Sequence, residues 1–82
     1  MTAKNREELK RQLKVGRFVL NQIARFYNDD WRRVGMTEDL GDHYEITMKH
    51  PRKSANIIIQ YDKSMTFATV LHGYKIIDAY KP

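Results

Sequence analysis

The stretch that decides the fold is Ala3–Tyr27, with the sequence AKNREELKRQLKVGRFVLNQIARFY. Apolar residues recur in it at alternating spacings of four and three, which keeps them on one side of an α-helix. Val15, Val19 and Phe26 broaden that side beyond a narrow coiled-coil seam, which is typical of a helix lying on a sheet. The sequence therefore predicts a long amphipathic helix whose apolar stripe faces a sheet. The stripe consists of Leu9, Leu13, Gly16, Leu20, Ile23 and Tyr27.

The same stretch carries the surplus positive charge of the chain. Residues 1–27 contain seven Lys or Arg and two Glu, a net charge of +5, which equals the formal net charge of all 82 residues. Cations spaced along one helix face can each approach a phosphate, although Lys and Arg also commonly cover a solvated face. The residues predicted to bind nucleic acid or another polyanion are Arg6, Lys10, Lys14, Arg17 and Arg25 in the helix, with Arg52 and Lys53 in a later loop.

Residues 28–42 form an acidic connector, with five acidic and two basic side chains and a net charge of −3. Ion pairs between this connector and the helix would mask part of the basic face. The only tryptophan, Trp31, lies in the connector beside Arg32 and Arg33. We expect Trp31 to close one end of the core, and we also include it among candidate interface residues.

From His43 onward the apolar period changes from 3.6 to 2, the period of a β-strand. Short connections with turn residues separate four predicted strands, which favours an antiparallel meander. We therefore predict a single α+β domain of order α-β-β-β-β, with the long N-terminal helix on one face of a four-stranded sheet over residues 43–81. The predicted strands are His43–Lys49, Ala55–Asp62, Met65–Leu71 and Tyr74–Tyr80.

The predicted outer face of this sheet contains more apolar residues than a fully solvated face should. Scattered apolar residues on a surface are normal, whereas a contiguous patch marks a dimer or partner interface. The residues that alternation places on the outer face are Ile58, Ala68, Val70, Ile77 and Ala79. Of these, Ile58, Val70 and Ile77 form the candidate interface, together with Trp31.

Several functional classes lack their usual sequence signals. The chain has no cysteine, and its three histidines, His43, His50 and His72, do not have metal-ligand spacing. It has no nucleophile elbow, phosphate loop or glycine fingerprint, and no apolar run near the ~20 residues that span a bilayer. We therefore expect no catalytic residue, metal, cofactor, small-molecule substrate or membrane association, and a cytoplasmic location.

Two functional hypotheses follow from these patterns. In the first, the chain is a small basic module that binds nucleic acid or another polyanion through its N-terminal helix. In the alternative, it is a protein-interaction module, or a small inhibitor or accessory protein of the kind that mobile elements encode. That protein would dock on an acidic partner or dimerise through the outer sheet face.

Overall fold

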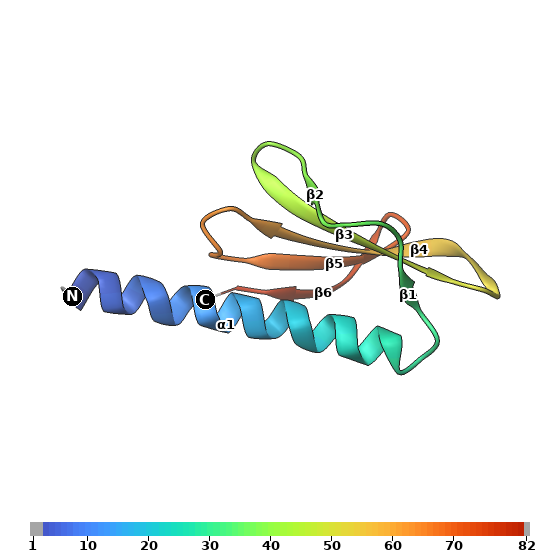
Figure 1. The fold of residues 1–82 in the computed structure, drawn as a ribbon, viewed down its shortest axis with the longest axis horizontal. Helices are drawn as coiled ribbons and strands as arrows, with labels where there is room; N and C mark the ends of the chain where they lie inside the picture. The colour runs from blue at the N-terminus through green and yellow to red at the C-terminus, as the bar shows by residue number, and fades with distance from the viewer. Residues whose placement is uncertain (1–2, 82) are drawn as a thin grey trace.

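The computed structural model describes residues 3–81 as one helix followed by six strands (Figure 1). It confirms the predicted α+β class, with the N-terminal helix packed against one antiparallel sheet. The sheet has more than the four predicted strands because two short strands form within the predicted connector. The elements are α1 (Ala3–Tyr27), β1 (Arg32–Arg33), β2 (Glu38–Asp39), β3 (His43–His50), β4 (Lys53–Asp62), β5 (Ala68–His72) and β6 (Lys75–Tyr80).

The connector runs back along the free edge of β3. Strand β1 pairs Arg32 with Lys49, and β2 pairs Glu38 with Glu45, so both short strands extend the sheet at its β3 edge. The remaining order is β3-β4-β5-β6, a meander of antiparallel neighbours. Gly41 has a φ of 98° in the turn into β3, a conformation that side chains with a Cβ rarely adopt.

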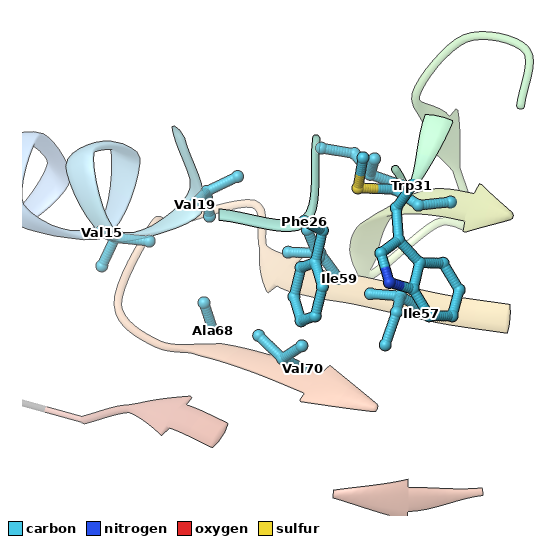
Figure 2. Close-up of a cluster of buried hydrophobic side chains, with 10 residues drawn as sticks. Val15, Val19, Phe26, Trp31, Ile57, Ile59, Ala68 and Val70 are labelled. Atoms are coloured by element: carbon cyan, nitrogen blue, oxygen red, sulfur yellow. The ribbon is translucent and has the colours of Figure 1, made fainter. Parts of the chain in front are cut away.

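The core lies between α1 and the middle strands of the sheet. Ile46, Ile59 and Val70 are paired across β3, β4 and β5, and each is almost completely buried. Figure 2 shows Val15, Val19 and Phe26 of α1 above Ile59, Ala68 and Val70 of the sheet. The buried apolar residues are Val15, Val19, Phe26, Trp31, Ile46, Met48, Ile57, Ile59, Ala68 and Val70.

The helix is rotated differently from the sequence prediction. Val15, Val19 and Phe26 are at most 6% exposed, whereas Leu13 and Leu20 of the predicted stripe are 60% and 66% exposed. At 100° per residue the two lines lie roughly 100° apart on the helix surface, so one sheet covers only one of them. The prediction that the leucine stripe faces the sheet was wrong, because the β-branched valines and Phe26 occupy that position.

The residues of the predicted stripe form a second apolar line along the flank of α1, which we call the leucine seam. Its members are Leu9, Leu13, Gly16, Leu20, Ile23 and Tyr27. The N-terminal turns of α1 project past the sheet (Figure 1), and residues 5–10 are all exposed. The seam therefore begins on a part of the helix that the sheet does not reach.

Strand β5 has the opposite facing from the prediction. Ala68 and Val70 are fully buried under the helix, and Thr69 and Leu71 lie on the outer face opposite Gln60 and Ile58. The prediction began the strand at Met65, but Met65 has a φ of 53° and belongs to the preceding turn. A start that differs by an odd number of residues reverses every side chain of a strand. The small Ala68 accordingly lies beneath the helix.

Trp31 closes the end of the core where α1 meets the sheet. Its side chain is 2% exposed and contacts the rings of Phe26, His50 and His72, with centroid distances of 6.0, 5.2 and 5.7 Å. The prediction that Trp31 covers the core is confirmed. Its inclusion as an interface residue was wrong, because a side chain this buried has no surface for a partner.

Truncation of a side chain on the buried face of the sheet should destabilise the protein much more than truncation of one on the exposed face. Ile59→Ala should lower the free energy of unfolding by ~2–5 kcal/mol, because Ile59 is fully buried and truncation leaves a cavity. Ile76→Ala is the control, because Ile76 is 62% exposed, and its effect should stay within about 0.5 kcal/mol. Urea denaturation followed by circular dichroism measures both. Equal effects would contradict the assignment of faces.

Candidate binding surface on the helix

Four of the predicted anion-binding residues lie together on the N-terminal two thirds of α1. Arg6, Lys10, Lys14 and Arg17 are all exposed. Lys10 Nζ lies 3.9 Å from Glu7 Oε1, but both side chains are more than half exposed, so the pair contributes little. Within residues 3–81, neither Arg6 nor Lys14 nor Arg17 forms an ion pair. The chain's own carboxylates therefore leave this part of the helix strongly cationic.

Arg25, the fifth helical residue of the predicted site, attaches α1 to strand β6. Its Nη1 lies 3.7 Å from Asp78 Oδ2 and donates to Gln22 Oε1 at 3.3 Å. Gln22 is the buried member of this group, at 7% exposed, and its Nε2 donates to Asp78 Oδ2 at 3.0 Å. Arg25 is thus engaged within the fold and is separated from the cations of the N-terminal turns.

Arg52 and Lys53 lie at the tip of the β3–β4 hairpin, at the end of the molecule away from the helix N-terminus (Figure 1). Arg52 Nη2 pairs with Asp30 Oδ2 at 3.3 Å, and Lys53 Nζ lies 5.7 Å from the centre of a Trp31 ring. The structure therefore does not bring these two residues together with the helix cations. The predicted seven-residue surface is divided between two ends of the fold.

The three predicted interface residues of the sheet do not all lie on its outer face. Ile58 does lie on that face, next to Thr47 and Leu71 in register, but it is only partly exposed. Val70 is fully buried on the opposite face, so its selection as an interface residue was wrong. Ile77 is 40% exposed and lies in a bulge, because Val70 pairs with Asp78 and Leu71 with Ile76.

The leucine seam forms one wall of a groove that the sequence analysis missed. Leu9, Leu13 and Leu20 are 44%, 60% and 66% exposed, and they line a hollow with Met65 of the β4–β5 turn and with Arg17. Gly16 lies against Met65, and a Cβ at this position would stand 3.4 Å from Met65 Cε. An apolar floor with a cation on its rim is chemically suited to an amphipathic ligand.

A second hollow continues the first toward the C-terminal end of α1. It is lined by Ile23 of the helix and by Tyr61 and Ile46 of the sheet. The two hollows share Gly16, Leu20 and Met65, so they form one groove along the helix. We call it the seam groove.

The far rim of the seam groove is also cationic. Arg33 of β1 lies opposite Met48, which places it on the helix side of the sheet, and its Nη2 donates to Thr37 Oγ1 at 2.8 Å. Glu38 pairs in register with Glu45 on the outer face, away from the groove. The described side chains that line the groove therefore include arginines on both rims and no carboxylate.

The sequence contained a signal for this groove. The seam has the alternating spacing of heptad a and d positions over nearly three heptads, separately from the line of Val15, Val19, Gln22 and Phe26. Two apolar lines on one helix indicate two contact surfaces. Reading both as one broad stripe concealed the seam.

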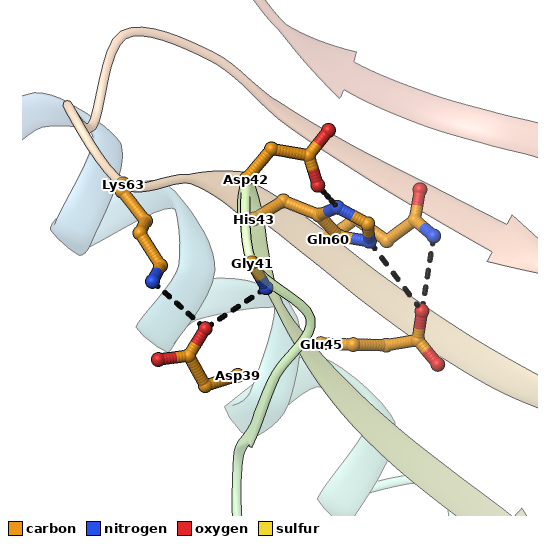
Figure 3. Close-up of polar contacts among 7 residues, drawn as sticks. All are labelled: Asp39, Gly41, Asp42, His43, Glu45, Gln60 and Lys63. Carbon is orange, nitrogen blue, oxygen red and sulfur yellow. Dashed lines mark hydrogen bonds and ion pairs between the residues drawn. The ribbon is translucent and has the colours of Figure 1, made fainter.

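A polar cluster lies at the N-terminal end of β3, where His43 begins the strand (Figure 3). Asp39 Oδ1 pairs with Lys63 Nζ at 2.8 Å and accepts the Gly41 N–H at 3.0 Å. The hydrogen bond with Lys63 lowers the pKa of Asp39, and the same bond raises the pKa of Lys63. The ion pair between Asp39 and Lys63 thereby connects β2 to the β4–β5 turn.

His43 of the same cluster lies between two carboxylates. Its Nδ1 is 2.6 Å from Asp42 Oδ1, and its Nε2 is 3.9 Å from Glu45 Oε2. The hydrogen bond with His43 lowers the pKa of Asp42. Glu45 also accepts a bond from Gln60 Nε2 at 3.1 Å. Both imidazole nitrogens thus face acidic groups, an arrangement that holds the ring in place.

Asp62 organises the turn between β4 and β5, which carries Met65. Its Oδ1 accepts the N–H groups of Thr66 at 2.7 Å and Phe67 at 3.0 Å, and its Oδ2 accepts the Ser64 hydroxyl. Partial burial acts to raise the pKa of Asp62, but these hydrogen bonds outweigh it and lower the pKa below its usual value. The turn therefore depends on an ionised carboxylate.

In comparisons with known proteins, no family model, curated protein or solved structure matches this chain. In the part of the chain from residue 3 to 81, the helix does not have the length and apolar character needed to cross a membrane. The same residues contain no group of three or more His, Asp or Glu side chains arranged to hold a metal ion.

Acid should weaken the β4–β5 turn. A carboxyl group whose pKa is lowered on folding adds stability above its unfolded pKa of 3.8, and this stability is lost as the pH falls through the folded pKa. Asp62→Asn should cost ~1 kcal/mol at pH 7 and progressively less from about pH 4 downward. Urea denaturation from pH 7 to pH 2 measures this. Asp29→Asn, at an exposed position outside the turn, is the control, and parallel pH curves for wild type and Asp62→Asn would contradict the prediction.

Proposed function

We propose that this chain is a non-enzymatic protein-interaction module that docks on an acidic partner protein through α1. The observation that carries the proposal is the position of the exposed leucine seam directly beside the exposed cations of the same helix. Burial of Leu13 and Leu20 by a partner would supply apolar contact area, at roughly 25 cal/mol per Å². The cations would attract an acidic surface and orient it.

Nucleic acid is the rival ligand, because the same cations suit phosphates. A duplex backbone, however, offers nothing apolar to cover leucines that are 60% and 66% exposed. The separation of Arg52 and Lys53 from the helix cations also shortens the basic track to four residues on α1. An acidic protein with apolar side chains satisfies both parts of the helix surface, so we favour it.

The cellular role that fits this proposal is that of a small inhibitor or accessory factor in the cytoplasm. In the polar cluster, Asp42 Oδ1 lies 2.6 Å from His43 Nδ1 and Glu45 Oε2 lies 3.9 Å from its Nε2. That arrangement supports a structural role for the histidine.

Reversing the charge of the helix should abolish partner binding. The triple variant Lys10→Glu, Lys14→Glu and Arg17→Glu should lose at least tenfold in affinity for the acidic protein captured by wild type, while its unfolding midpoint stays close to wild type. All three side chains are exposed, so the fold does not need them. The measurement is affinity capture from nuclease-treated extract, followed by titration of the captured protein at two salt concentrations.

The control variant carries Lys49→Glu, Lys75→Glu and Lys81→Glu, which changes the net charge equally at exposed positions outside α1. It should bind like wild type. Equal losses in the two triple variants would show that net charge alone attracts the partner. If all capture disappears on nuclease treatment and a gel shift appears with nucleic acid, the ligand is nucleic acid and the proposal is wrong.

A further inference from the structure

The seam groove has the form of a site for a second helix. Seen as heptads, Leu13, Leu20 and Tyr27 occupy a positions, and Leu9, Gly16 and Ile23 occupy d positions. From Leu9 to Tyr27 the seam is about 27 Å long, because an α-helix rises ~1.5 Å per residue. A partner segment of about 18–20 helical residues matches this length.

We infer that the acidic partner docks as an amphipathic α-helix that lies in the seam groove and packs its apolar side chains against the leucine seam. This inference rests on the proposed function and names the form of its ligand. Gly16 lacks a side chain at the centre of the seam, between Leu13 and Leu20. Met65 Cε covers this position, 3.4 Å from where a Cβ would stand, so a docked helix would contact Met65 between the two leucines.

The charges at the rims select an acidic helix. Lys10 and Arg17 follow the d positions directly, at heptad position e, where residues contact the flank of a paired helix. Arg33 supplies a cation on the opposite rim. Glu side chains along both flanks of the partner helix would therefore lie near positive groups, and Lys at those places would be repelled.

A second copy of this chain is a poor occupant of the groove. Residues 1–27 have a net charge of +5, so pairing two such helices would bring two strongly positive segments into one interface. Like charges at flanking positions of paired helices oppose association. The charge of the seam region thus favours a different chain with acidic flanks.

The test uses a synthetic helical peptide as the probe. The peptide has 21 residues, Leu at heptad a and d positions, Glu at the flanking positions, and a hydrocarbon staple on its far side to hold the helix. Fluorescence anisotropy should show binding to wild type that weakens as salt is raised. Leu13→Asp combined with Leu20→Asp should weaken it at least tenfold, and the fold should survive because both leucines are exposed. Ile76→Asp combined with Ile77→Asp, at exposed positions of β6 outside the seam groove, adds the same two charges and is the matched control; it should bind like wild type.

Two control peptides separate the outcomes. One replaces Glu with Lys, and the other keeps the composition but scrambles the Leu positions; both should bind at least tenfold more weakly. Equal binding of the scrambled peptide, or unchanged binding by the Leu13/Leu20 variant, would overturn the helix inference while leaving an acidic partner in place. A wild-type dimer in analytical ultracentrifugation that dissociates in the Leu13/Leu20 variant would make a second copy the occupant. That result would overturn this inference and the proposed function together.

Discussion

The contact of Val15, Val19 and Phe26 with the sheet fixes the rotation of α1, and the other features of the surface depend on that rotation. Once these side chains cover Ile59 and Val70, the leucine seam must lie on the flank of the helix. The helix cations then lie beside the leucine seam, on the surface of α1 that faces away from the sheet. Trp31 and the hydrogen bond between Gln22 and Asp78 secure the same orientation at the C-terminal end of α1.

Much of this fold was predictable from the sequence. The 3.6-residue period gave the limits of α1, and the change to a period of two at His43 gave the sheet and its antiparallel order. The closing role of Trp31 was predictable because the one tryptophan of the chain follows directly after the end of the helix. Strands β1 and β2 were not, since two residues each are too short to show a period.

The errors arose where a pattern admitted two interpretations. The two faces of β5 were assigned the wrong way round, because Asp62 extends the preceding turn through hydrogen bonds from the Thr66 and Phe67 N–H groups. The alternation of apolar residues alone does not reveal this longer turn. The seam was misread because leucine is the more obvious core residue, although the valines pack more closely against a sheet. For the candidate site, the sequence indicated the helix cations, but the separation of the β3–β4 hairpin tip from the N-terminal turns of α1 is a property of the folded chain (Figure 1).

The position of Trp31 also has a spectroscopic consequence. The chain has a single indole, which is buried between two imidazole rings at the joint of helix and sheet. Its emission therefore reports the integrity of that joint in the intact domain.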